Sequence, residues 1–210
     1  MAGGMSTAQL HEARIELAAC DAGLARVHAA IEPLVWRRKT PGFAGLARLI
    51  IEQQVSVASA RAIVARVEAG LGEITPEHLL AHDVESLRGL GLSIQKANYL
   101  HNAAHAQADP VLVLTHIAGL DDAGAVTALT QIKGIGRWTA EAYLMGCEGR
   151  TDLLPAGDLA LQEAIRHADE SDERPTTGQL YDRAEAWRPW RGVAAHMLWA
   201  YYGQVKNQAQ

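Results

Sequence analysis

The stretch LTQIKGIGRWTAEAYL occupies residues 129–144 and contains two glycines around one isoleucine. Apolar residues at helical spacing lie on both sides of Gly134-Ile135-Gly136, a segment too rich in glycine to continue a helix. Glycine reaches positive φ without strain and leaves no Cβ in the way of an approaching backbone. The stretch therefore predicts two helices joined by a tight, bare turn.

The start of the second helix is a predicted anion site. The first amides of a helix have no partner within the helix, and the helix dipole favours negative charge beside them. A phosphate fits such a position, and Lys133 and Arg137 add positive charge around it. The alternative is a turn in which the glycines serve geometry alone, because short helix connections commonly contain glycine.

Most of the remaining chain shows helical spacing of its apolar residues. Ser56, Thr75 and Ser93 each precede such a segment, as N-cap residues do, and Pro76 suits a first helical position. The best strand candidate, PVLVLTHI at 110–117, is isolated. The sequence predicts an all-α protein of roughly nine to eleven helices.

Composition narrows the class of protein. The chain has 210 residues, of which 49% are hydrophobic and 20% charged, as in an ordinary globular protein. The net charge of −5 argues weakly against nucleic acid as a partner, since phosphate binders usually present a basic surface. Cys20 and Cys147 are too few for a disulfide framework or a metal cluster. With no signal peptide and no membrane-length apolar run, we expect a bacterial-type cytoplasmic protein.

Asp158 is the leading catalytic candidate. It follows Pro155-Ala156-Gly157 and directly precedes a segment with helical spacing. An aspartate there is an ordinary N-cap. A carboxylate fixed in that way can also stabilise an oxocarbenium ion and orient an attacking water, as in glycosyl cleavage. The two roles are compatible.

The string L-x-x-I-K-G-I-G-R-W-T-A, with Asp158 20 residues past Trp138, resembles the helix-hairpin-helix DNA glycosylase superfamily. The resemblance covers roughly residues 43–203. It implies that the hairpin grips a DNA phosphate, often with a bound monovalent cation at the hairpin carbonyls, and that Asp158 is catalytic. The implied phosphate-binding residues are Lys133, Gly134, Ile135, Gly136 and Arg137.

Trp138 indicates which branch of the superfamily the sequence resembles most. Family members that also cut the DNA backbone carry a lysine nucleophile at this position, and tryptophan cannot act as one. Its presence looks like the alkylbase (3-methyladenine) DNA glycosylase II branch, the AlkA type, in which the indole stacks on the flipped base. An aromatic face attracts the positive charge of an alkylated purine. Core packing is the alternative for a tryptophan at helical spacing.

The segment AWRPWRGVAAHMLWAYY (186–202) also resembles that branch. It implies that Trp199 is a second aromatic of the base pocket, whereas Trp187 and Trp190 are structural. Aromatic packing on one helix face is the alternative. Ala142 stands where a larger pocket residue is expected, with Tyr143 one position away. This departure predicts a wider base pocket.

The segment LARLIIEQQVSVASARAIVARV (46–67) resembles the part of the branch whose turn enters the minor groove. Gln54 is then the intercalating wedge, and its amide can hydrogen-bond the orphaned base. The alternative is a polar pair that ends a helix. By similarity of GLGLSIQKANYL (89–100), Lys96 is a phosphate contact.

The sequence thus predicts one all-α helix-hairpin-helix glycosylase domain over residues 1–210, without an N-terminal β domain. We expect a central lobe at approximately 43–130, a second lobe from the N-terminal helix and approximately 131–210, and an active-site cleft between them. The expected activity is monofunctional excision of alkylated bases from duplex DNA by a monomer that needs no cofactor. The alternatives are a glycosylase for other damaged or mismatched bases and a non-catalytic DNA-binding protein.

Overall fold

The computed structural model describes residues 5–36 and 38–208, and these residues form helices and loops but no strand. Contacts divide the chain into two compact units, Lys39–Glu148 and Met1–Arg38 with Gly149–Gln210. Among the described helices, none combines the length and hydropathy needed to cross a lipid bilayer. The expected all-α class is confirmed.

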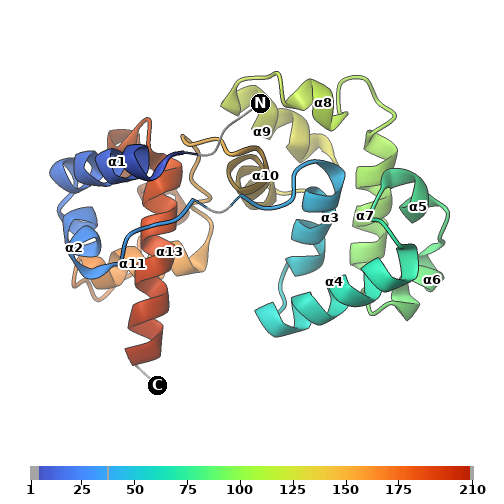
Figure 1. The fold of residues 1–210 in the computed structure, drawn as a ribbon, viewed down its shortest axis with the longest axis horizontal. Coiled ribbons are helices and arrows are strands. Elements are labelled where there is room, and N and C mark those ends of the chain that lie inside the picture. The colour runs from blue at the N-terminus through green and yellow to red at the C-terminus, as the bar shows by residue number, and fades with distance from the viewer. Residues whose placement is uncertain (1–4, 37, 209–210) are drawn as a thin grey trace. The chain divides into compact units, whose positions relative to one another are not determined.

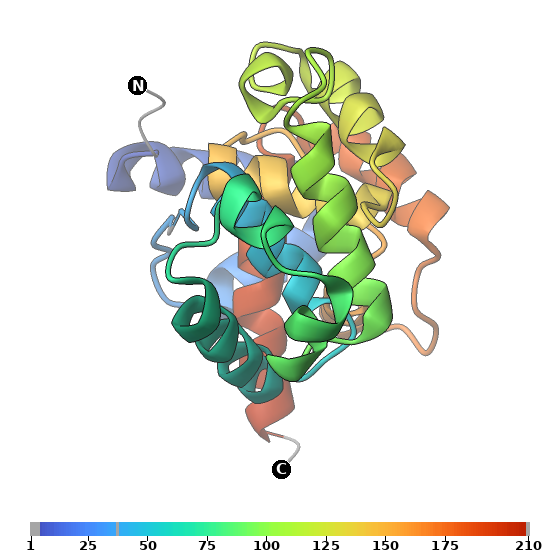
Figure 2. The ribbon, with the colours of Figure 1, turned by 90° about the vertical axis from the view of Figure 1, so that its right-hand side faces the viewer.

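The continuous unit, Lys39–Glu148, is built around α7, the long green helix of Figure 2. Helices α3, α5 and α6 pack against α7, and α10 packs against both α3 and α9. The elements of this unit are α3 (Gly42–Glu52), α4 (Val57–Leu71), α5 (Pro76–Leu80), α6 (Val84–Gly89), α7 (Ile94–Ala106), α8 (Leu114–Ile117), α9 (Asp122–Gln131), α10 (Arg137–Tyr143) and the π-helical turn η1 (Leu144–Glu148).

The other unit joins the two ends of the chain around α13, the red helix of Figure 1. Helices α1, α2 and α11 all pack against α13. Val193, Ala194, Met197 and Leu198 of α13 are fully buried. The elements of this unit are α1 (Thr7–Cys20), α2 (Ala22–Ala30), α11 (Leu159–Ala168), α12 (Thr177–Ala184), the 3-10 turn η2 (Glu185–Trp187) and α13 (Arg191–Gln208).

The helix starts follow the expected caps. The side chains of Ser56, Thr75, Ser93 and Asp158 each accept a hydrogen bond from a backbone amide in the first turn of the next helix. These bonds satisfy amides that have no partner inside the helix. The four predicted caps are confirmed.

Two expectations differ from the structure. The described residues contain thirteen α-helices rather than nine to eleven, partly because α5, α6 and α8 are very short. The expected lobe boundary near residue 130 also differs from the observed one at Glu148. The hairpin that follows α9 stays with the central unit because α10 packs on α9 and α3.

Candidate functional site

The hairpin between α9 and α10 is closed by two buried isoleucines. Ile132 and Ile135 are each 3% exposed, and the Ile135 amide donates to the Ile132 carbonyl at 2.9 Å. Gly134 between them has φ +104°, a conformation that side chains with a Cβ rarely adopt. A Cβ at this position would also collide with Cβ, Cγ and Cδ1 of Tyr99 from α7. Gly134 is therefore required for both backbone shape and packing.

Gly136 serves a different purpose. Its φ is −84°, so this glycine does not use the positive φ that glycine permits. A Cβ here would meet no atom within 4 Å, and the residue is exposed. As the N-cap of α10, Gly136 provides no side-chain hydrogen bond to the first turn. Gly136 therefore places no side chain of its own at the helix start, where an anion would approach.

The two positively charged side chains beside the hairpin, Lys133 and Arg137, differ in their surroundings. Lys133 is exposed at its edge. Arg137 donates from Nε to Oε1 of Glu141 at 2.9 Å, and the Glu141 side chain is only 2% exposed. The positive charge expected from Arg137 is thus partly balanced by a buried carboxylate one turn further along α10.

Lys96 is engaged within the protein. Its Nζ donates to the Ile51 carbonyl at 2.6 Å, which belongs to the last turn of α3. Burial lowers the pKa of Lys96. The side chain that the sequence suggested as a phosphate contact therefore holds the end of a helix.

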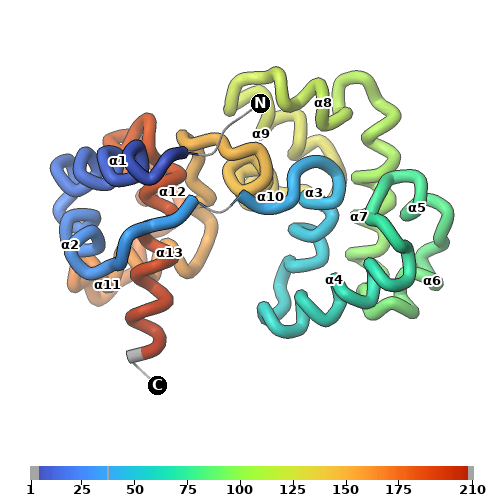
Figure 3. The backbone as a smooth tube through the Cα atoms, in the orientation of Figure 1, coloured from blue at the N-terminus to red at the C-terminus, as the bar shows by residue number. Residues whose placement is uncertain are grey.

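The turn from α3 into α4, traced in Figure 3, carries the predicted wedge. Gln54 is exposed and has φ +53°, the left-handed region that non-glycine residues rarely occupy. Its neighbours Val55 and Val57 are also exposed, by 37% and 70%. Strained backbone and exposed apolar side chains of this kind are typical of contact sites.

The neighbouring Gln53 points toward the hairpin. Its Nε2 donates to the Gly134 carbonyl at 3.3 Å and to Oγ1 of Thr139 at 3.0 Å. A groove of about 640 Å³ lies between this turn, the start of α7 and the hairpin. The groove is lined by Gln53, Gln54, Val55, Ser93, Gln95, Lys96, Tyr99, Thr130, Ile132, Lys133, Gly134, Ile135, Gly136 and Thr139. The groove therefore brings Gln54 and Lys96 together with the predicted hairpin residues 133–136, whereas Arg137 does not line it.

Asp158 lies in the other unit as the N-cap of α11. Its Oδ1 accepts from the amides of Ala160 at 2.8 Å and Leu161 at 3.4 Å. The residues before it, 153–156, are buried, and Nε2 of Gln162 donates to the Ala156 carbonyl at 2.8 Å. Asp158 is half-buried and its carboxylate is held by two amides of α11, so the N-cap interpretation holds and the catalytic one stays a prediction.

The predicted pocket residues differ in burial. Trp138 and Trp199 are partly exposed, whereas Ala142 and Tyr143 are 8% and 1% exposed. Trp138, Ala142 and Tyr143 lie on α10, and Trp199 lies on α13. Their roles toward a base stay predictions, although Tyr143 has almost no accessible surface to offer one.

Two further residues join Trp199. The His196 ring stacks on Trp36 with ring centroids 4.3 Å apart, and it meets Trp199 edge-on at 5.5 Å. Burial lowers the pKa of His196, which favours the neutral imidazole. Sequence reasoning missed this cluster, because Trp36 lies 160 positions from His196 and no spacing pattern connects the two.

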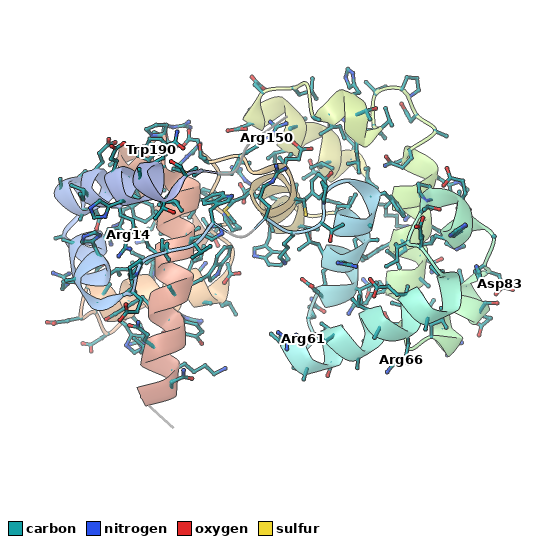
Figure 4. The ribbon with its side chains drawn as sticks, in the orientation of Figure 1. Arg14, Arg61, Arg66, Asp83, Arg150 and Trp190 are labelled. Carbon is teal, nitrogen blue, oxygen red and sulfur yellow. The ribbon has the colours of Figure 1, made fainter. Side chains whose placement is uncertain are left out.

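Trp187 and Trp190 have structural roles. Trp187 is 1% exposed and donates from Nε1 to Oδ2 of Asp21 at 2.9 Å. Trp190, labelled in Figure 4, donates from Nε1 to Oε2 of Glu16 on α1 at 2.7 Å. Both contacts tie the C-terminal segment to the N-terminal helices.

In the described part of the chain, no group of three or more His, Cys, Asp or Glu side chains could hold a metal ion. A monovalent cation at the hairpin carbonyls stays a prediction from the family resemblance. Two of those carbonyls already accept hydrogen bonds from side chains, Gly134 from Gln53 and Lys133 from Asn102.

Residues 47–189 match the HhH-GPD superfamily of base excision DNA repair proteins. The chain belongs to this superfamily. It is 33% identical over 158 residues to DNA-3-methyladenine glycosylase 1 of Schizosaccharomyces pombe, covering 73% of the chain and 69% of the relative. It is 33% identical over 174 residues to DNA-3-methyladenine glycosylase 2 of Escherichia coli, covering 77% and 58%. A putative DNA-3-methyladenine glycosylase of Bacillus subtilis is 29% identical, and the match spans 56% of its length.

Solved structures agree with this assignment. A DNA-3-methyladenine glycosidase from Bacillus halodurans superposes with a TM-score of 0.80 at 31% identity, covering 93% of this chain and 91% of that one. The Schizosaccharomyces pombe 3-methyladenine DNA glycosylase in complex with abasic DNA gives 0.78 at 30% identity, covering 90% and 95%. The 8-oxoguanine glycosylase/lyase of Clostridium acetobutylicum, at 17% identity and a TM-score of 0.77, shares the fold alone. The expected helix-hairpin-helix glycosylase fold is confirmed.

Proposed function

We propose that this protein is a monofunctional DNA glycosylase that removes alkylated bases from duplex DNA by hydrolysis of the N-glycosidic bond. The observation that carries the proposal is Asp158, a carboxylate held at the start of α11 by two backbone amides. At that place in the superfamily pattern, a fixed negative charge stabilises the oxocarbenium-like transition state and orients the attacking water.

The hairpin provides the DNA grip in this proposal. Gly136 adds no side chain at the start of α10, and Lys133 adds an exposed positive charge at the edge of the hairpin. Backbone amides recognise a phosphate without reading the base sequence, which suits an enzyme that searches duplex DNA for damage. Such a local site also explains how a chain of net charge −5 binds DNA.

The base is handled by extrusion. Gln54, at the exposed and strained turn, fills the stack vacated by the flipped nucleotide. Trp138 and Trp199 offer partly exposed indoles that attract a positively charged alkylated purine. Cationic bases are good leaving groups, so the reaction needs little acid catalysis at the base.

Base release from duplex oligonucleotides tests the activity. The substrates carry 3-methyladenine, 1-methyladenine, ethenoadenine or hypoxanthine, and wild type is compared with Asp158→Asn. Asparagine is as good an N-cap as aspartate, so this variant removes the charge while α11 keeps its start. We expect release of the alkylated bases to fall by about 100-fold or more, with DNA binding retained. Wild type that releases no base would support the non-catalytic alternative, and release of hypoxanthine alone would support the other-base alternative.

The absence of lyase chemistry is tested separately. Because Trp138 has no amine, we expect borohydride to trap no covalent complex between wild type and a duplex with an abasic site. Trp138→Ala should lower release of 3-methyladenine by about tenfold through lost stacking, while circular dichroism and the melting temperature stay close to wild type. A trapped complex would contradict the monofunctional assignment, and an unfolded variant would favour core packing as the role of Trp138.

A further inference from the structure

We infer that Gln53 and Lys96 are positioning residues, which together hold the turn carrying Gln54 against the hairpin so that the wedge and the phosphate grip meet DNA as one preset body. The inference rests on the proposed function, because it assigns roles to the same DNA-binding surface. All of the residues involved belong to the continuous unit Lys39–Glu148.

The turn needs such support because its backbone is strained. Gln54 occupies φ +53°, and a non-glycine residue keeps that conformation only where its surroundings determine it. Local support is small. The Gln53 amide donates to the Ile50 carbonyl at a long 3.4 Å, and α4 begins only after the cap at Ser56. Contacts from outside the turn must therefore stabilise it.

Gln53 supplies the contact toward the hairpin. Its Nε2 carries two hydrogens, and these are donated to the Gly134 carbonyl at 3.3 Å and to Oγ1 of Thr139 at 3.0 Å. Thr139 is 3% exposed, so the bond is partly shielded from solvent. One amide thereby connects the wedge turn with both the loop of the hairpin and the first turn of α10.

Lys96, in the first turn of α7, supplies a second contact, to the end of α3. Its Nζ donates to the Ile51 carbonyl at 2.6 Å, at the end of α3 where carbonyls lack helical partners. Desolvation of the ammonium, which lowers the pKa of Lys96, agrees with an inward-facing side chain. From α7, Asn102 donates to the Lys133 carbonyl at 3.2 Å, and Tyr99 packs under Gly134. Helix α7 thus supports the turn and the hairpin together.

The test compares Gln53→Met and Lys96→Met, which keep an unbranched side chain of the same length as glutamine and one atom shorter than lysine but remove the donors. Arg66→Met is the matched control. Arg66, labelled on α4 in Figure 4, donates from Nε to the Leu90 carbonyl at the end of α6 at 3.0 Å, outside the groove. The first readout is amide hydrogen exchange over segments 51–57 and 132–137, which requires no enzymatic activity. We expect exchange to rise in both segments for both variants, and in neither segment for the control.

The second readout is base extrusion, followed by 2-aminopurine fluorescence in a duplex at several salt concentrations. We expect extrusion to fall by about tenfold in Gln53→Met and Lys96→Met, because the strained turn is no longer preset. The salt dependence of duplex binding should stay that of wild type. A salt slope reduced by about one in Lys96→Met would identify a phosphate contact and overturn the positioning role.

Unchanged exchange in the two segments would also overturn the inference, whatever the enzyme does. Conversely, wild type that releases no base while exchange rises as expected would sink the proposed function and leave the positioning role standing. The two proposals therefore fail through different measurements.

Discussion

At the scale of single residues, Gly134 and Gly136 show that two glycines in one motif can be present for opposite reasons. Gly134 faces inward, where φ +104° and the Tyr99 ring leave no room for a Cβ. Gly136 faces outward, where a Cβ would meet nothing in the protein. Gly134 is needed for the hairpin to fold, whereas Gly136 leaves space for a ligand to approach the hairpin.

Alanine substitutions separate these roles. Gly134→Ala should lower the free energy of unfolding by about 2 to 4 kcal/mol, through left-handed strain and overpacking against Tyr99. Gly136→Ala should cost about 1 kcal/mol or less, as the loss of a glycine N-cap, yet weaken duplex DNA binding by about tenfold, because its methyl group stands where the phosphate approaches. Denaturant unfolding and a DNA titration check both. Equal DNA affinities for wild type and Gly136→Ala would show that the hairpin does not contact DNA at Gly136.

At the scale of elements, helix starts could be predicted because a cap is a local signal. Ser56, Thr75, Ser93 and Asp158 each bond an amide two or three residues ahead, so residue type and spacing suffice. Asp21 was missed, since the apolar spacing of the N-terminal segment runs on past the point where Asp21 ends one helix and caps the next.

Contacts between distant segments could not be predicted in this way. The strand-like PVLVLTHI ends in the short helix α8. The Trp36–His196 stack and the bond from Gln53 to Gly134 join residues 160 and 81 positions apart. The spacing of apolar residues along the chain does not indicate which distant residues contact one another. The hairpin and Asp158 were recognisable only because a long family pattern fixes both residue types and their order.

The cluster that His196 and Trp199 of α13 form with Trp36 predicts how stability depends on pH. Burial lowers the pKa of His196 below its ordinary 6.5, so the unfolded chain binds a proton more readily than the folded one. Stability is therefore full above pH 6.5 and is lost as the pH falls. His196→Phe replaces the imidazole by an aromatic ring that cannot bind a proton. The stability of wild type relative to this variant should therefore decrease from pH 7 to pH 5.

Denaturant titrations at each pH provide that comparison. The control is His116→Phe, which changes an exposed histidine on α8 and should leave the pH dependence of wild type in place. A relative stability of wild type and His196→Phe that is constant with pH would mean that His196 binds its proton equally well in the folded and the unfolded chain, which would contradict the lowered pKa.

At the scale of the whole molecule, one unit is built from both ends of the chain, and Asp21 joins them. It comes from the segment before residue 39, whereas its partners Arg183 and Trp187 come from the segment after residue 148. Arg183 donates to the two Asp21 oxygens, each at 2.7 Å, and the Asp21 side chain is 8% exposed. A discontinuous unit depends on such a contact, because the chain itself does not hold its two parts together.

Asp21→Asn should therefore lower the free energy of unfolding by about 1.5 to 3 kcal/mol at neutral pH, since it removes charge-assisted hydrogen bonds from Arg183 and leaves that side chain paired with Asp169 alone. Burial alone would raise the pKa of Asp21, but hydrogen bonds from Arg183, the Leu24 amide and Trp187 outweigh it and lower the pKa to about 2. The stabilisation is thus complete above the ordinary value of 3.8 and is lost as the pH falls toward 2. The difference between wild type and Asp21→Asn should shrink over that range, whereas exposed Asp182→Asn should match wild type throughout. A difference that stays constant down to pH 2 would show that charge at Asp21 contributes nothing to joining the two chain segments.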